Sequence, residues 1–586
     1  MRQITIITLL FLLAACIEIP EPNDLDTPPP DPEGKVQIIE LSEHARILGE
    51  PTQLTHDRRA SSNLAVNAPW LYDTRNANYQ AADGIAFTTD IETTDEVSVW
   101  ARIYAETDNT HGWLIRIDGT DQTVQADNVQ EYEWHEIYRG SLQDNVHFEI
   151  TPRGPRSRLD VLAITSHRSY ENLDDFLDIP EPVPIPDAQY YVAVDGSDSA
   201  PGTRSEPFRT IQHAINHAQP GDTILVRQGT YGGFEIDGSG TNEAWITVQA
   251  YPGERVILDA HITETSDHAV IFIRPSSRYW IFDGFEITNT NPFLDTIRAL
   301  DVEQEEDRQE YIELRDSPER RELWAVRMLH SPHRERSGHL IFQNLEVHRT
   351  GTTGYSGSAD NVQFLNNHVY DLGYPRSDYG WYATGINHTF RGNIIHDLSR
   401  PIVGRAPRDP ASQNLIFEQN LVYRNGLVPW YHGSSERFKT NSWAMVVRGV
   451  DSNPRDTIIR NNKFLYNGRG IEEFSENSLI AHNLFVGHVT SEAIRMRQDG
   501  GRIINNVFID NNEDIELRGT GTIIEGNLKD PPQSYANLDG LDFTVLDNSP
   551  TINAGRDFPE VNDDFYGNPR PYAGGWDAGP VERRAD

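Results

Sequence analysis

The chain has 586 residues, which is enough for two or three domains. It holds 89 acidic and 50 basic residues, and a formal net charge of −39 argues against nucleic acid as a partner. Its single cysteine excludes an intrachain disulfide. Composition therefore excludes a disulfide-stapled or nucleic-acid-binding protein, and the order of the residues has to indicate the fold.

The N-terminus predicts secretion. Residues 4–12 form an apolar run that is too short to span a bilayer as a mature helix. The following Leu-Ala-Ala-Cys resembles a bacterial lipobox, which implies that residues 1–15 are a signal peptide and that Cys16 is acylated and holds the protein on a lipid bilayer. Ile17 in place of Asp favours the outer membrane or the cell surface. Residues 16–35, rich in Pro, Asp and Glu, predict a disordered tether.

A first domain is predicted over residues 36–168. Short runs with period-two alternation are bounded by turn residues, which favours an antiparallel β-sandwich. Val99-Trp-Ala-Arg-Ile103 and Ile117-Asp-Gly119 resemble a carbohydrate-binding-like jelly roll. The Pro-rich residues 169–188 predict a semi-rigid linker to the next domain.

A short pattern recurs between residues 340 and 529, in which an apolar residue stands three positions before an asparagine. Internal repeats of about 20 to 50 residues predict a solenoid, and the alternating apolar residues within each repeat favour strands over helices. Asparagine tolerates the left-handed backbone of a tight turn and can also bond to its copy in the next coil. The repeated residues are Asn344, Asn367, Asn393, Asn420, Asn462, Asn483, Asn506 and Asn527.

The two ends of the repeat region also carry recognisable segments. Tyr190-Tyr-Val-Ala-Val-Asp-Gly-Ser-Asp198 and Pro220-Gly-Asp-Thr-Ile-Leu-Val226 open it, and Ser549-Pro-Thr-Ile-Asn553 is near its end. With the asparagine pattern, they resemble the right-handed parallel β-helix of the pectate-lyase-like superfamily over about 190–582. The resemblance implies an all-β chain, with a single-stranded solenoid over residues 189–586. Lyases, hydrolases, epimerases and adhesins share this scaffold, so the resemblance leaves the reaction open.

Several segments interrupt the solenoid pattern. Residues 210–218 predict a short helix that caps the open end of the stack. Residues 289–338 are dense in charge and predict an insertion with a helical part. Two aromatic-rich loops, 371–381 and 426–443, are expected to bind substrate, because loops on a rigid scaffold often carry function. Their expected substrate-binding residues are Tyr379, Trp381, Trp430, Tyr431 and Trp443.

Arginines recur at the ends of strands in the repeat region. Alternation predicts that they face outward along one side of the solenoid, as a basic stripe on an acidic protein. Arginine grips carboxylate and sulfate well, so the stripe predicts an anionic polysaccharide as partner. The alternative is a face neutralised by acids such as Glu472 and Glu516. The arginines are Arg274, Arg405, Arg448, Arg495, Arg497 and Arg518.

A uronate polysaccharide would be cleaved most naturally by β-elimination. Lys439 is the base that we expect, and Arg405 and Arg448 would neutralise the carboxylate. Calcium is a further candidate for that role, held by Asp360, Asp371 and Asp378. His388 and His396 are expected to be structural, with proton transfer as the alternative.

Two other functions stay open. A glycoside hydrolase would need two carboxylates facing the groove, which Asp360, Asp371, Asp378 and Asp397 could supply. A non-catalytic glycan-binding lipoprotein would use the aromatics and arginines alone, and a C5-epimerase shares the elimination chemistry. We expect a monomer, and no catalytic block of a known family can be transferred residue by residue.

Overall fold

The structure, a computed structural model, describes the strands β1–β11 between residues 36 and 165 and most of residues 186–584. Cys16 lies outside the described residues. No helix in the described part of the chain is long and apolar enough to cross a membrane. The gaps after residue 186 are 267, 301–303, 315–323, 330–334, 351–352, 373–378, 407–413, 428–429, 433–436, 440–441, 450–453, 489, 532–533, 539–540, 573 and 585–586.

The N-terminal strands form two antiparallel sheets, as the alternation predicts. One has the order β3-β4-β11-β6-β9 with β1 beside β11, and the other has the order β2-β5-β10-β7-β8. Buried apolar residues such as Val99, Phe148 and Ile164 form one core. The strands are Val36–Glu40, Arg46–Ile47, Gln53–His56, Leu64–Asn67, Ile85–Asp90, Glu96–Ala105, Gly112–Ile117, Thr120–Gln125, Tyr132–Ser141, Asn145–Pro152 and Ser157–Thr165.

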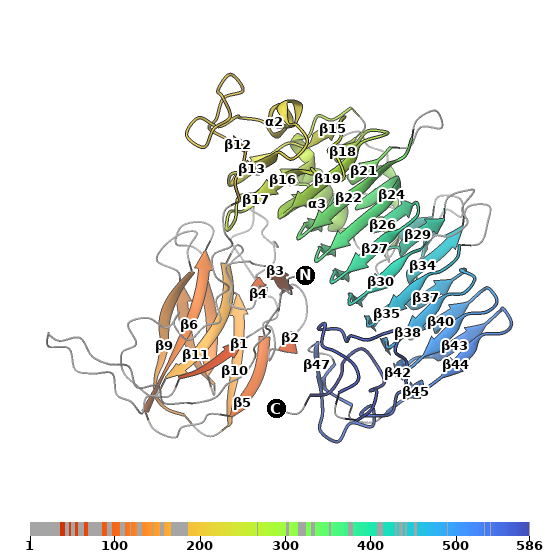
Figure 1. Cartoon of the computed structure of the whole chain (residues 1–586). Helices are drawn as coiled ribbons and strands as arrows, with labels where there is room; N and C mark the ends of the chain where they lie inside the picture. The colour runs from red at the N-terminus through yellow and green to blue at the C-terminus, as the bar shows by residue number, and fades with distance from the viewer. Residues whose placement is uncertain are drawn as a thin grey trace, which may run out of the picture.

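Residues from 190 onward form a parallel β-helix, in which each coil adds one strand to each of three sheets (Figure 1). The long strand β24 (Tyr355–Leu365) runs from the first sheet into the second.

The first sheet contains β15 (Phe234–Ile236), β18 (Ala269–Ile273), β21 (Trp324–Met328), β24, β26 (Trp381–Thr384), β29 (Ile402–Ala406), β34 (Trp443–Gly449), β37 (Arg469–Glu473), β40 (Glu492–Met496) and β43 (Glu513–Leu517).

The second sheet contains β12 (Tyr190–Val192), β13 (Thr223–Val226), β16 (Ile246–Ala250), β19 (Arg278–Asp283), β22 (Ser337–Gln343), β24, β27 (His388–Arg391), β30 (Ile416–Glu418), β35 (Ile458–Arg460), β38 (Leu479–Ala481), β41 (Arg502–Ile504) and β44 (Ile523–Glu525).

The third sheet contains β14 (Gly229–Tyr231), β17 (Val256–Asp259), β20 (Phe285–Thr288), β23 (Glu346–His348), β25 (His368–Tyr370), β28 (Ile394–His396), β31 (Leu421–Tyr423), β36 (Lys463–Leu465), β39 (Leu484–Val486), β42 (Val507–Ile509) and β45 (Leu528–Lys529).

The interior is held together by columns of like residues. Phenylalanines stack from coil to coil, with ring centroids 4.7 Å apart between Phe364 and Phe390 and 5.1 Å apart between Phe464 and Phe485. Such offset stacks add to the burial of apolar surface. One coil cannot bury its apolar side alone, so the stack makes the core continuous.

The asparagine ladder predicted from the repeat is present between the second and third sheets. From Asn367 to Asn527, each side-chain amide donates to the carbonyl of the next asparagine, at 2.8–3.0 Å. Asn344 is not part of it, because Leu345 occupies that position and donates its backbone N–H to Asn367. The left-handed backbone belongs to the residue before each ladder asparagine, for example Asn366 and Asn461.

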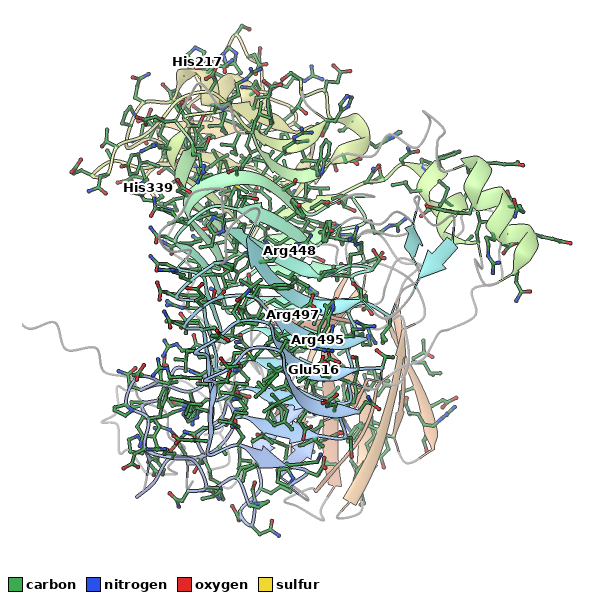
Figure 2. The ribbon with its side chains drawn as sticks, turned by 90° about the vertical axis from the view of Figure 1, so that its right-hand side faces the viewer. His217, His339, Arg448, Arg495, Arg497 and Glu516 are labelled. Carbon is green, nitrogen blue, oxygen red and sulfur yellow. The ribbon has the colours of Figure 1, made fainter. Side chains whose placement is uncertain are left out.

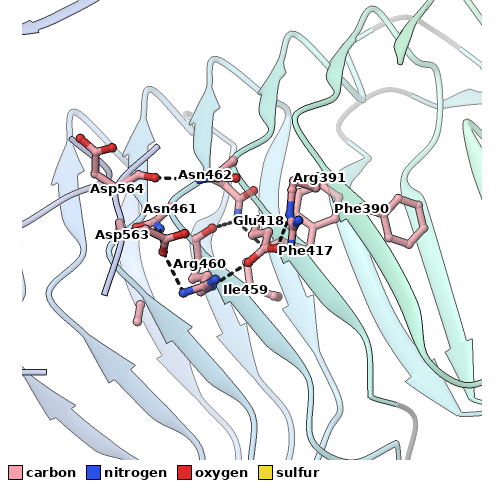
Figure 3. A network of polar contacts seen from close by, with 12 residues as sticks. Phe390, Arg391, Phe417, Glu418, Ile459, Arg460, Asn461, Asn462, Asp563 and Asp564 are labelled. Atoms are coloured by element: carbon pink, nitrogen blue, oxygen red, sulfur yellow. Dashed lines mark hydrogen bonds and ion pairs between the residues drawn. The ribbon is translucent and has the colours of Figure 1, made fainter. Parts of the chain in front are cut away.

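The two ends of the solenoid differ. Helix α2 (Ile211–His217) covers the N-terminal end with Ile211 and Ala214 buried, and Thr210 caps it. Beyond β45 the chain turns back along the outside of the second and third sheets, and β46 (Tyr535–Asn537) and β47 (Asp542–Val545) pair there. Figure 3 shows one attachment, in which Arg460 lies between Glu418 and Asp563.

The predicted insertion is shorter than 289–338. It holds α3 (Pro292–Arg298) and α4 (Glu305–Leu314), and Ile297 packs with Tyr311. Strand β21 pairs with β18 and β24 as an ordinary rung of the first sheet, and β22 follows in the second. The insertion therefore lies between β20 and β21. The short 3-10 helix at Ala260–Ile262 follows β17.

Candidate substrate-binding face

The candidate site is the outer face of the first sheet from β24 to β43. Alternation within each strand turns one residue into the core and the next toward the outer face, as at β34, where Val447 is buried and Arg448 is half-buried, although Val446 is covered as well. The connections that join the third sheet to this one are long before β21, β26 and β34. Figure 2 shows Arg448, Arg497, Arg495 and Glu516 one below the other along this face.

Two predicted residues, Arg405 and Arg448, are direct neighbours. They are register partners on β29 and β34, and Thr384 is the partner of Arg405 on β26. The side chain of Arg405 lies outside the described residues. Within the described part of the chain no carboxylate pairs with Arg448, and its buried Nε has no hydrogen-bond partner. Two arginines on adjacent rungs, with no acid against Arg448, form a site suited to an anion.

The other stripe arginines are held by acids. Glu472 accepts from Arg497 at 2.6 Å and also contacts Arg495, while Glu516 pairs with both Arg495 and Arg518. Glu492 adds a third carboxylate beside Arg495.

Arg274 pairs with Glu235, whose pKa is lowered by Ser266 and Arg274 even though burial raises it. A continuous basic stripe was therefore the wrong prediction. The acids Glu472 and Glu516, considered as the alternative, neutralise its C-terminal part because the register places them on neighbouring rungs.

Aromatic and cationic groups lie at the start of β34 and β26. The guanidinium of Arg469 is 5.4 Å and that of Arg495 is 4.9 Å from the ring of Trp443, which is half-buried. Arg400 lies 4.0 Å over the ring of Tyr379 and donates to its hydroxyl. Arg469 and Arg400 were not predicted, because each precedes or begins a strand, whereas the predicted arginines stand at the ends of strands.

One aromatic prediction is wrong. Trp381 is completely buried and stacks on Tyr355, with ring centroids 4.9 Å apart. It is the first residue of β26, where its register partner Ile402 is also buried. Trp381 therefore belongs to the core and cannot stack on a sugar.

The predicted base stands on a hairpin. Strands β32 (Trp430–His432) and β33 (Arg437–Lys439) are antiparallel, and Lys439 is the register partner of Trp430. The hairpin lies in the connection from β31 to β34, so it precedes the strand that carries Arg448. The side chains of Trp430, Tyr431 and Lys439 lie outside the described residues, and their roles stay predictions.

The predicted calcium ligands do not form a cluster in the described part of the chain, which holds no group of three His, Cys, Asp or Glu suited to a metal. Asp360 accepts from Arg336 at 3.1 Å and from the backbone N–H of Ile386. Asp371 follows β25 of the third sheet with a left-handed backbone, and Asp378 lies outside the described residues. Asp360 is thus already neutralised by an arginine.

The histidines and Asp397 are engaged in the fold. His388 Nε2 contacts the carbonyl of Ala359 at 2.8 Å. His396 contacts Asp397 at 2.5 Å and His368 at 2.8 Å, and is fully buried. Burial raises the pKa of Asp397, but His396 and Arg424 outweigh it and lower that pKa. Asp397 is therefore poorly suited to act as a proton donor.

Part of the chain is similar in sequence to known proteins. Residues 190–396 match the family described as Pel9A-like, right handed beta helix region. Pectate lyase PEL9 of Emericella nidulans is 35% identical over 116 residues, which are 17% of this chain and 28% of that protein. YwoF of Bacillus subtilis, an uncharacterized protein, is 33% identical over 117 residues, 20% of this chain and 23% of that protein. The matched stretches thus span less than a third of either relative.

Two solved structures are similar in outline. Pectate lyase Pel9A has 16% identity and a TM-score of 0.46, and covers 67% of this chain and 96% of its own. A rhamnogalacturonan lyase has 15% identity and a TM-score of 0.41, and covers 65% of this chain and 99% of its own. Together with the parallel sheets, the match over residues 190–396 confirms the predicted fold, a right-handed parallel β-helix.

Proposed function

We propose that this protein is a polysaccharide lyase that cleaves a uronate-containing glycan on the outer face of the first sheet. The observation that carries the proposal is the pair of adjacent rungs with Arg405 and Arg448, where Arg448 has no carboxylate partner among the described residues. A partly buried guanidinium without a counter-ion is energetically unfavourable, and a bound anion would neutralise it. The similarity to PEL9, a pectate lyase, supports the same reaction class.

The chemistry requires a cationic pocket and a base. Arg405 and Arg448 bind the uronate carboxylate and disperse the negative charge that develops when the C5 proton leaves. Lys439, in its neutral form, takes that proton. The electron pair left on C5 forms the C4–C5 double bond, and the bond from C4 to the glycosidic oxygen breaks. That oxygen takes a proton from water, and the ammonium of Lys439 returns the C5 proton to the solvent. The products are a new reducing end and an unsaturated uronate.

Hydrolysis is the less supported alternative. It needs one carboxyl group that holds a proton and a second that is ionised, both facing the substrate. Asp360 and Asp397 are paired with arginines, and Asp378 lies outside the described residues. The acids on the site face, Glu472 and Glu516, are paired with arginines as well.

The test is incubation with alginate, pectate, chondroitin and sulfated algal glycans, followed by the ultraviolet absorbance of unsaturated uronates. R448A is expected to lower kcat/KM by about 100-fold or more, as loss of a charge-stabilising donor does. K439A is expected to lower kcat by about 100- to 10,000-fold. R518A is the matched control, because Arg518 is already paired with Glu516. New reducing ends without ultraviolet absorbance would replace the proposal with hydrolysis.

The role of calcium is tested in the same activity assay. Activity is compared with and without EDTA, and with added Ca²⁺.

We also propose that acylated Cys16 anchors the protein at the bacterial outer membrane or cell surface, on the basis of the lipobox-like Leu-Ala-Ala-Cys. C16A should move the protein from the membrane fraction to the soluble fraction, and unchanged fractionation would refute the anchor.

A further inference from the structure

The outer face of the first sheet changes its charge from coil to coil, and this pattern bears on the substrate. We infer that the protein acts on a glycan in which single uronates are separated by neutral sugars, in preference to a polymer of uronates alone. The inference rests on the proposed function and specifies its substrate class. Its basis is the charge of the residues on either side of Arg405 and Arg448.

The two rungs on the N-terminal side are neutral. Thr384 on β26 is the register partner of Arg405, and Ser358 on β24 is the partner of Thr384. The second outward position on the same strands holds Tyr382 and Ser356, which are also partners. All four are half-buried. These rungs offer hydroxyl groups, which suit the hydroxyl groups of a neutral sugar and supply no positive charge.

On the C-terminal side, the cations near the strand ends that continue from Arg448 are already paired with acids. Phe474 follows Glu473 at the end of β37, and its backbone N–H bonds to Val447 beside Arg448. Beyond it, Arg495, Arg497 and Arg518 face Glu472, Glu492 and Glu516. Three positive charges against three negative charges leave no net charge there for a second carboxylate. Arg469 has no ion pair among the described residues either, but it begins β37 beside Trp443, whereas Phe474 follows the end of that strand. At the ends of these strands, positive charge without an ion pair is thus found at Arg448.

The spacing of the coils determines which sugars of a bound glycan would face Arg448 and which would face the neighbouring rungs. Parallel strands lie about 4.8 Å apart, and an extended pyranose chain along the axis advances by about one sugar per rung. A polyuronate would bring a carboxylate to the hydroxyl rungs, which carry no cation, and to the rungs of Glu472 and Glu516, whose arginine partners are already paired. A chain with neutral sugars between its uronates places one carboxylate at Arg448 and avoids those contacts. A charged group left without a counter-ion is a common source of specificity.

The first experiment compares oligosaccharides of equal length, one set of uronate alone and one set in which uronate alternates with a neutral sugar. The sets are made with galacturonate, glucuronate and mannuronate, and cleavage is followed by ultraviolet absorbance. We expect kcat/KM to be about tenfold or more higher for an alternating set. Equal or faster cleavage of the uronate-alone sets would overturn the inference and keep the proposed function. Absence of unsaturated product from every set would overturn the proposed function, and the inference with it.

A gain-of-function variant tests the charge pattern itself. T384R adds a third arginine to the rungs of Arg405 and Arg448 without breaking an ion pair. It is expected to raise kcat/KM for uronate-alone oligosaccharides by about fivefold or more and to leave the alternating set nearly unchanged. T389R is the matched control, because Thr389 is half-buried on β27 of the second sheet and adds the same charge to a different face. Equal effects of T384R and T389R would contradict the inference.

Discussion

Glu473 occupies a position that the neighbouring coils give to apolar side chains. Its register partners in the first sheet are Val447 and Met496, and all three are buried. The backbone N–H of Ser475 donates to one carboxyl oxygen at 2.6 Å, and the other oxygen has no hydrogen-bond partner. Burial therefore raises the pKa of Glu473 to about 7, although the Ser475 hydrogen bond opposes the change.

This carboxyl group should make stability depend on pH. Its pKa is about 7 when folded and 4.5 at the reference value, so the folded protein holds the proton more tightly. Its contribution to stability is fully present below about pH 4.5 and is lost as pH rises through about 7. E473Q removes the titration, and we expect its free energy of unfolding at about pH 8 to exceed that of the wild type by on the order of 3 kcal/mol.

Urea unfolding at several pH values measures this difference. E513Q is the control, because Glu513 is exposed on β43, and its curve should run parallel to that of the wild type. A stability curve for E473Q that keeps the wild-type slope between about pH 5 and 8 would show that Glu473 is not the titrating group.

The asparagine ladder is the element that fixes the turn between the second and third sheets. In the middle of the ladder, Asn462 is fully buried and donates to the carbonyl of Phe417 and to Asn483. Its own carbonyl accepts from the backbone and side chain of Asn420. Every polar atom of that side chain thus satisfies a group of a neighbouring coil, which a smaller apolar residue could not do.

N462A should therefore be strongly destabilising. It leaves several buried donors and acceptors unpaired, at about 1–3 kcal/mol each, so we expect unfolding to become easier by about 3–5 kcal/mol in total. N527A removes the last residue of the ladder, which is half-buried and has no asparagine beyond it in the ladder, and should cost about 1 kcal/mol. Both are measured by urea unfolding, and equal losses for the two variants would mean that the ladder does not act through buried pairing.

The same element shows how far the sequence predicts the structure. The repeat of asparagines predicts the solenoid and its ladder. The alternation that places the stripe arginines outside also places Met445, Val447 and Met496 inside, and all three are buried. They do not predict which coil ends the core. Leu517 has the same alternation, but it belongs to the last rung of the first sheet and is 42% exposed.

Site residues were harder to predict than the core. Trp381 was assigned to a loop because the strand boundary falls at that residue, and the difference of one residue decides between core and surface. The pairing of Arg495 with Glu472 and Glu516 depends on register between coils separated by 21 to 23 residues. Repeat length varies in this chain, so neighbours across coils become certain only when the strands are paired.

At the scale of the whole molecule, the C-terminal segment, residues 534–584, links the coils from β30 to β45. This segment contacts coil after coil outside the second and third sheets. Asp564 accepts from Gln419, Asp563 pairs with Arg460, and Glu560 pairs with Arg502. Apolar residues of the segment, such as Phe543 and Val581, pack with Leu465, Val486 and Val507 of the third sheet.

That segment contains a completely buried ion pair. Arg570 and Glu582 are 2.7 Å apart, with both side chains completely buried, and Arg570 also donates to the carbonyls of Asp563, Asp577 and Gly579. Burial lowers the pKa of Arg570 in spite of the surrounding carboxylates. A buried ion pair of this kind contributes little net stability by itself, but loss of one partner leaves the other as an unpaired charge in the interior.

R570M should loosen the segment and, with it, the C-terminal coils. It leaves Glu582 and three carbonyls without their donor, at an expected cost of about 3–5 kcal/mol. R583M is the matched control, because Arg583 pairs with Asp547, whose side chain is 86% exposed, and such surface pairs are worth about 0–1 kcal/mol. Limited proteolysis with mass spectrometry should show early cleavage between residues 534 and 584 in R570M and none in R583M. If R570M resists the protease as well as R583M does, the segment is held by its apolar contacts with the third sheet.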